Sequence, residues 1–132
     1  MSQYRVLIVD DHELVRRGLK EILRGTNFIV CGEAENGQEG LVQTVSLRPD
    51  LVLLDMSMPV LTGLQAAAKI RQVLPDIKIL IVTMHDSPQM ELEARAAGAD
   101  AYITKMAAAK SLLEAMRALV GASNGSSRPA QV

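Results

Sequence analysis

Three short apolar runs, each followed at once by polar groups, constrain the fold of this chain most. They span residues 6–9, 51–54 and 77–82. Runs of this length are typical of strands buried on both faces of a parallel sheet when they are rich in β-branched residues and lack polar alternation. Two weaker runs, at 28–31 and 101–104, are expected to be edge strands.

The stretches between these runs have the spacing and punctuation of helices. A stripe of apolar residues with helical spacing lies at 112–120, near the C-terminus. Asn36 and Thr62 each begin a capping-box pattern, which is typical of the start of a helix. Ser87 precedes Pro88, a residue that the first turn of a helix tolerates. A further stripe lies near the N-terminus and comprises Leu14, Val15, Leu19, Ile22 and Leu23.

Strands and helices therefore alternate five times at short spacing. Alternation of this kind predicts an α/β fold in which helices cover both faces of a parallel sheet. The three most apolar runs belong in the middle and the two weaker ones at the edges. This agrees with a flavodoxin-like, doubly wound, five-stranded sheet of order 2-1-3-4-5 with five helices.

A length of 132 residues is that of one domain. We place this domain at residues 1–120. From 121 to 132 the chain is rich in Gly, Ser and Ala, and we expect it to be a flexible linker or tail. Such a segment either leads to a further domain or is a disordered end.

Composition excludes several classes of function. Fourteen basic and fifteen acidic side chains give a net charge of −1, which argues against direct nucleic-acid binding. No apolar run approaches the roughly 20 residues needed to cross a bilayer, so no membrane association is expected. A single cysteine, Cys31, fits a reducing cytoplasm. One Phe, two Tyr and no Trp provide little for stacking on a flavin.

Carboxylates follow two of the predicted central strands. Asp10 and Asp11 end the first, and Asp55 ends the second. The carboxyl ends of parallel strands share one edge of the sheet, where open α/β folds bind ligands. At about 5 Å and an effective dielectric of about 20, each pair of carboxylates repels by roughly 3 kcal/mol. A hard cation such as Mg²⁺ would relieve this repulsion.

A hydroxyl and an amine are expected at the same edge. Thr83 ends the strand at 77–82 and Lys105 follows the strand at 101–104. A metal and an ammonium can neutralise phosphoryl oxygens, a hydroxyl can donate to them, and a carboxylate can act as the nucleophile. The combination predicts a site for a phosphoryl group.

Taken together, these motifs resemble the receiver domain of two-component response regulators, the CheY-like fold. The matching features are the acidic pair, Asp55 followed by Gly63, Thr83, and the segment from Tyr102 to Lys105. They run from about residue 5 to about residue 119. The sequences at 10–18 and 83–86 resemble the NarL/FixJ subfamily, whose members usually carry a LuxR-type helix-turn-helix domain after a linker.

The resemblance implies a role for each carboxylate. Asp55 would be the phosphoacceptor, receiving a phosphoryl group from a sensor histidine kinase or a small phosphodonor. Asp10, Asp11, Asp55 and the backbone carbonyl of Ser57 would hold Mg²⁺ or Mn²⁺. Lys105 would pair with Asp55 before phosphorylation and with the phosphoryl group afterwards.

The resemblance also implies a switch. Thr83 would move toward the phosphoryl group and Tyr102 would move inward behind it, changing the last helix, strand and helix. Dimerisation would use that face or the first helix. DNA would be bound only through an output domain absent from this chain. The chain itself is expected to be a regulatory phosphoacceptor and not an enzyme.

Two departures and two alternatives stay open. Met106 stands where receivers commonly have proline, so the preceding peptide bond is expected to be trans. Met84 is bulkier than is usual after the switch threonine. The chain could act as a receiver-like interaction module without phosphorylation, or as an aspartyl-phosphate phosphatase. Ser57 disfavours the phosphatase, which would want an acid at that position.

Overall fold

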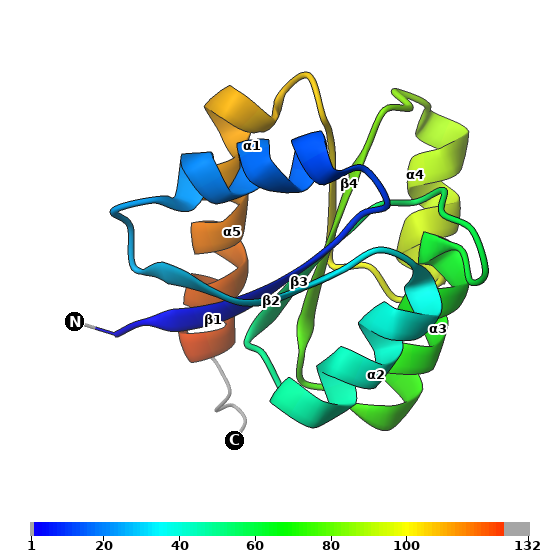
Figure 1. The fold of residues 1–132 in the computed structure, drawn as a ribbon, viewed down its shortest axis with the longest axis horizontal. Coiled ribbons are helices and arrows are strands. Elements are labelled where there is room, and N and C mark those ends of the chain that lie inside the picture. The colour runs from blue at the N-terminus through cyan, green and yellow to red at the C-terminus, as the bar shows by residue number, and fades with distance from the viewer. Residues whose placement is uncertain (1, 126–132) are drawn as a thin grey trace.

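The computed structural model describes residues 2–125 and contains one five-stranded parallel sheet in the order β2-β1-β3-β4-β5. This order confirms the prediction, with the two weaker runs at the edges (Figure 1). The strands are β1 (Tyr4–Val9), β2 (Phe28–Ala34), β3 (Leu51–Leu54), β4 (Lys78–Thr83) and β5 (Ala101–Thr104).

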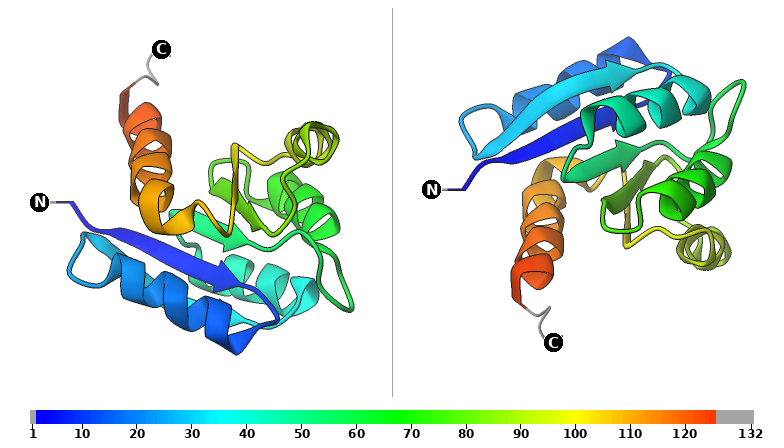
Figure 2. Two further views of the ribbon diagram at one scale, coloured as in Figure 1. Left: turned by 90° about the horizontal axis from the view of Figure 1, so that it is seen from above. Right: turned by 90° about the horizontal axis from the view of Figure 1, so that it is seen from below.

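Five helices connect the strands and cover both faces of the sheet. Helices α1 and α5 lie together on one face, and α2, α3 and α4 lie on the other (Figures 1 and 2). The helices are α1 (Glu13–Leu23), α2 (Gly37–Leu47), α3 (Gly63–Val73), α4 (Pro88–Ala96) and α5 (Ala108–Gly125).

The central strands are buried on both sides, as their composition predicted. Alternate residues of β1 divide between the two layers: Val6 and Ile8 pack with α1 and α5, whereas Leu7 and Val9 pack toward the other three helices. The side chains of β3 and most of those of β4 divide in the same way and are almost fully buried. This double burial fixes the positions of the strand ends that carry the polar residues.

Local signals determine where the helices begin. Thr62 and Gln65 form a reciprocal capping box at the start of α3. The Asn36 side chain accepts from the Glu39 backbone at the start of α2, but Glu39 itself accepts from the backbone of Glu35, so this box is incomplete. Such caps satisfy amide groups that the first helical turn leaves without intrahelical partners.

Three details refine the sequence-based predictions. Strand β2 extends to Ala34, three residues past the predicted run. Helix α5 continues to Gly125, whereas the linker was expected to start at residue 121; residues 126–132 lie outside the described part. Within residues 2–125 no peptide bond is cis, so the bond before Met106 is trans.

In the same range, no helix is long and apolar enough to span a membrane.

Candidate phosphoryl and metal site

The structure brings the polar strand ends together at the carboxyl edge of the sheet. Asp10 follows β1 and Asp55 follows β3, the strand beside it, while Thr83 ends β4 and Lys105 follows β5. Asp10, Asp55 and Thr83 retain at most 5% of their accessible surface. Parallel pairing aligns the strand ends, so residues up to 95 positions apart in the chain become neighbours.

Lys105 joins the two buried carboxylates. Its Nζ lies 2.8 Å from Asp10 Oδ2 and 3.3 Å from Asp55 Oδ1. The lysine backbone is held by its own amide, which donates to the Thr83 carbonyl at 2.7 Å. One ammonium therefore contacts two acids, and the shorter contact is with Asp10 and not with the expected partner Asp55.

The electrostatics of this group are unbalanced toward negative charge. Burial, and then the charge of Asp10, raise the pKa of Asp55, and Lys105 offsets only part of that rise. Burial acts to lower the pKa of Lys105, but its hydrogen bond with Asp10 and the charge of Asp55 outweigh burial and raise it. The amine is thus firmly protonated, while the carboxylate at Asp55 is costly to ionise without a further cation.

The segment from Asp10 to His12 offers ligands for that cation. The Asp10 Oδ1 atom accepts from the His12 amide at 2.8 Å, and the His12 Nδ1 atom lies 3.1 Å from Asp11 Oδ1. Among the described side chains, Asp11 Oδ1 is buried without a hydrogen bond of acceptable geometry. One ligand atom from each of these three residues lies within 4.8 Å of the others. Two hard carboxylates, one of them with a buried oxygen that lacks a hydrogen bond, fit Mg²⁺.

His12 belongs to this group although its side chain was not predicted as a ligand. Its place directly after the acidic pair is the only signal in the sequence, and its ring is largely exposed. Asp55, which was also predicted as a ligand, is not a member of this three-residue group, and its carboxylate pairs with Lys105. The predicted ligand Ser57 lies two residues after Asp55 and is exposed.

A glycine allows the loop after β3 to approach Asp55. The Gly63 amide donates to the Met56 carbonyl at 2.8 Å. A Cβ atom at Gly63 would lie 1.9 Å from the Asp55 carbonyl oxygen, which no other residue type can tolerate without movement of the backbone. Gly63 therefore allows the start of α3 to pack against the backbone of Asp55.

Thr83 and Tyr102 both contact the backbone of His85. The buried Thr83 Oγ1 accepts from the His85 amide at 3.2 Å, and the Tyr102 hydroxyl donates to the His85 carbonyl at 2.5 Å. Burial raises the pKa of Tyr102, so the hydroxyl keeps its proton. The loop between β4 and α4 thus connects the two residues, a role for the His85 backbone that composition and spacing do not reveal.

The two methionines that depart from the expected pattern extend largely into solvent. Met84 is 67% exposed and Met106 is 91% exposed. Neither side chain is therefore part of the protein interior.

The chain matches the model of the response regulator receiver domain over residues 6–117. It belongs to the response regulator receiver family. This confirms the resemblance, and the described order of strands is that of the family's flavodoxin-like fold.

Two curated relatives are themselves response regulators. It is 40% identical to the response regulator GacA of Pseudomonas viridiflava and 39% identical to the response regulator protein VraR of Staphylococcus aureus, over 114 residues in each case. These matches cover 86% of the chain but only 53% and 54% of the relatives, so the chain spans about half of their length.

Solved structures agree with this placement. A LuxR-family two-component response regulator from Aurantimonas sp. SI85-9A1 superposes with a TM-score of 0.85 and 36% identity, covering 91% of this receiver and 87% of that chain. A LuxR-family DNA-binding response regulator from Staphylococcus aureus gives 0.81 at 27% identity, covering 88% and 98%.

Proposed function

We propose that this receiver is a phosphorylation-dependent switch in which Asp55 accepts a phosphoryl group from a sensor histidine kinase in a Mg²⁺-dependent reaction. The observation that carries the proposal is the Lys105 ammonium held between Asp10 and Asp55, next to a buried Asp11 oxygen without a hydrogen bond. An excess of buried carboxylate is unfavourable unless a cation lies among the oxygens, and that cation together with Lys105 could then neutralise an incoming phosphoryl group.

The chemistry follows from these positions. A carboxylate oxygen of Asp55 bonds to phosphorus as the bond to the phosphohistidine nitrogen breaks, and that nitrogen keeps the electron pair. The product is an acyl phosphate. Charge spreads over the phosphoryl oxygens in the transition state, so Lys105 stabilises it by turning from a carboxylate to those oxygens. Asp10, Asp11, Asp55 and the Ser57 carbonyl would hold Mg²⁺ or Mn²⁺, which would supply further neutralising charge.

The switch would start at Thr83. Its Oγ1 atom already accepts from the His85 amide, so its hydroxyl proton is free to donate to a phosphoryl oxygen. Movement of Thr83 would pull the backbone of His85, to which the Tyr102 hydroxyl is bonded. The phosphoryl group would thereby change the face formed by α4, β5 and α5. A shift from 1:99 to 99:1 needs about 5.5 kcal/mol of differential interaction.

The output would be transcriptional and lie outside this chain. The matched region covers only 53% and 54% of the two relatives, and one similar solved structure is described as a DNA-binding response regulator. We propose that residues 121–132 lead to a helix-turn-helix domain, and that dimerisation uses the α4–β5–α5 face or α1. Size-exclusion chromatography with and without phosphodonor tests the dimer.

Intact mass spectrometry tests the phosphoacceptor. The protein is incubated with Mg²⁺ and a small phosphodonor, and Asp55→Asn is compared with Asp86→Asn, a change in the exposed loop after β4. We expect one phosphoryl adduct in the unaltered protein and in Asp86→Asn, and none in Asp55→Asn. Lys105→Met should slow the reaction.

Other outcomes would point to other functions. Equal adduct in Asp55→Asn would move the acceptor elsewhere. Complete absence of adduct in every protein would favour an interaction module that acts without phosphorylation. Turnover of a phosphoester substrate without accumulation of adduct would indicate a phosphatase.

A further inference from the structure

Arg16 connects α1 to the backbone of the acidic pair. Its side chain is only 11% exposed, although it is an arginine near the start of a surface helix. The Nη1 atom donates to the Asp10 carbonyl at 2.7 Å, and the Nε atom donates to Glu33 Oε1 at 2.8 Å. One guanidinium thus joins three elements: α1, the end of β1 and β2.

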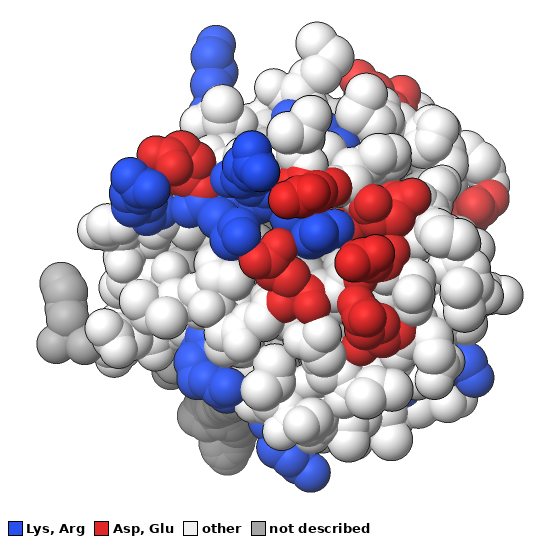
Figure 3. Space-filling model, in the orientation of Figure 1, with Lys and Arg blue, Asp and Glu red and all other residues white. Residues whose placement is uncertain are grey.

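Glu33 is itself held from two further sides. Lys20 of α1 lies 2.6 Å from its second carboxylate oxygen, and Gln43 of α2 donates to its carbonyl at 2.6 Å. The hydrogen bond from Lys20, followed by that from Arg16, outweighs burial and lowers the pKa of Glu33. The acid is therefore ionised at neutral pH and anchors Arg16. Figure 3 shows basic and acidic side chains lying side by side on this face.

The contact with the Asp10 carbonyl restrains Asp11 as well. The Asp10 carbonyl and the Asp11 amide belong to one planar peptide unit, so a bond that orients the first orients the second. The Asp10 side chain is held separately by the His12 amide. The Asp10–Asp11 backbone is thus restrained, while one buried oxygen of the Asp11 side chain lacks a hydrogen bond.

We infer that Arg16, anchored by Glu33, is a positioning residue that orients the Asp10–Asp11 peptide for a divalent cation. The inference rests on the proposed function, because it assumes that the acidic pair binds Mg²⁺. Neither residue was singled out by the sequence, since the atoms involved come from positions 6, 17 and 23 residues apart.

The sign of the change in cation affinity on removal of Arg16 distinguishes a positioning role from a purely electrostatic one. Arg16 carries a positive charge next to the site, so a purely electrostatic view expects its removal to tighten cation binding. Loss of the bond to the Asp10 carbonyl would instead loosen the ligand geometry and weaken binding. Partners outside the ligand shell typically change metal affinity by about 10- to 100-fold.

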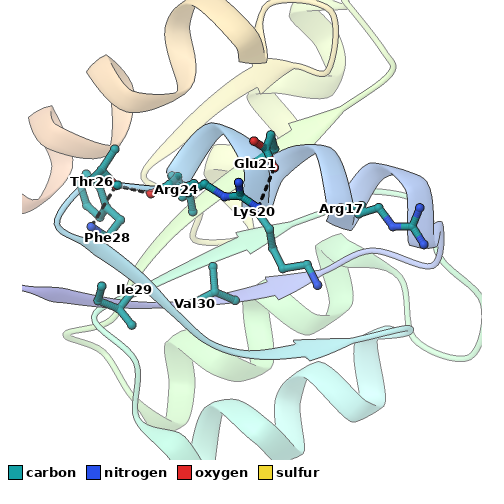
Figure 4. A pocket seen from close by; sticks show the side chains of 10 residues that line it. Arg17, Lys20, Glu21, Arg24, Thr26, Phe28, Ile29 and Val30 are labelled. Carbon is teal, nitrogen blue, oxygen red and sulfur yellow. Dashed lines mark hydrogen bonds and ion pairs between the residues drawn. The ribbon is translucent and has the colours of Figure 1, made fainter.

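The test measures Mn²⁺ affinity by the electron paramagnetic resonance signal of free Mn²⁺. Arg16→Met is compared with Arg17→Met, a matched change one position along α1. Arg17 lines a hollow of about 490 Å³ between α1 and β2, its side chain is 68% exposed, and it pairs with Glu13 at 3.4 Å (Figure 4). Urea unfolding in EDTA, recorded in parallel, measures the stability of each metal-free protein.

We expect the dissociation constant for Mn²⁺ to rise about tenfold in Arg16→Met and to stay within twofold in Arg17→Met. Arg16→Lys keeps the charge but reaches one acceptor only, so its rise should be smaller, and it serves as the readout if Arg16→Met does not fold. Lower stability with unchanged or tighter Mn²⁺ binding in the Arg16 variants would overturn the inference. Absence of Mn²⁺ binding in the unaltered protein would instead contradict the proposed function.

Discussion

Two partly buried charge clusters of this receiver are built on opposite principles. At the carboxyl edge of the sheet, Asp10 and Asp55 share the single ammonium of Lys105, and Asp11 adds a buried oxygen without a hydrogen bond. In the second cluster, Arg71 of α3 is paired one to one with Asp100 at 2.6 Å.

The second cluster is also saturated with hydrogen bonds. Arg71 donates to the carbonyls of Gly98, Pro75 and Ile77, and Asp100 accepts in addition from the Ile79 amide at 2.8 Å. These bonds tie α3 to the start of β4 and to the turn before β5. The first cluster has an unpaired Asp11 oxygen and an acid whose pKa is raised.

The difference teaches how to tell a structural cluster from a reactive one. A balanced, fully bonded pair is costly to break, because its removal leaves buried groups unpaired. An unbalanced cluster is costly to keep, and removing one acid relieves repulsion. Removal of one charge should therefore change stability with opposite signs in the two clusters.

The largest effect is expected at Arg71. Arg71→Met should lower the free energy of unfolding by about 2 kcal/mol, because Asp100 and three carbonyls lose their donor. Urea titration measures it. Arg24→Met is the control: that side chain is 78% exposed and its pair with Glu21 is 3.5 Å long, so the change should stay within about 0.5 kcal/mol. Equal losses in both variants would contradict the assignment of the Arg71 cluster as structural.

Metal should stabilise the unbalanced cluster. Mg²⁺ at ten times its dissociation constant is expected to raise the free energy of unfolding by about 1.4 kcal/mol relative to EDTA. Asp11→Ala should lose most of this gain, while Asp86→Ala, in the exposed loop after β4, should keep it. Thermal unfolding with and without Mg²⁺ provides the measurement, and an unaltered gain in Asp11→Ala would remove Asp11 from the ligand set.

The same Asp-to-Asn change should have opposite signs in the two clusters. Without metal, Asp55→Asn is expected to raise the free energy of unfolding by about 1 kcal/mol, since repulsion with Asp10 and Asp11 disappears. Asp100→Asn should lower it, since the bond from Arg71 loses its charge. Denaturant titrations at pH 7 test both, and destabilisation by both would show that Lys105 already balances the acidic group.

The smallest effect concerns pH. Folding raises the pKa of Asp55 above its ordinary value of 3.8, so the folded state binds this proton more tightly than the unfolded chain does. The contribution of Asp55 to stability therefore falls as the pH rises above 3.8, and the advantage of Asp55→Asn grows over the same rise. It should shrink as the pH falls toward about 3.8. Glu33 acts in the opposite direction, but it is common to both proteins and cancels in the difference.

Much of the fold was predictable because its signals are local. The apolar runs, Thr62 with Gln65, and Ser87 before Pro88 each lie within six residues of the strand or helix end they define. Periodicity was less reliable at one position, because Leu14 was counted in the stripe of α1 but is 75% exposed. It precedes Val15 by about 100° of helix rotation, so it points away from the buried side.

Partner choice within the site was not predictable. Chain positions indicate that Lys105 reaches the acidic edge, yet whether its amine contacts Asp10 or Asp55 more closely depends on the twist and packing of four strands. The contacts of Arg16 and Arg71 were missed for the same reason. Each joins elements far apart in the sequence, and an arginine on a helix is by default a solvated side chain.

The sequence by itself determined the order of elements and the residues that end each strand, because hydrophobic periodicity and caps act over a few neighbouring positions. Only the tertiary structure decided which charges are paired and which are left in excess. That outcome depends on distances of a few ångströms between segments tens of residues apart, and on the burial that makes those distances matter.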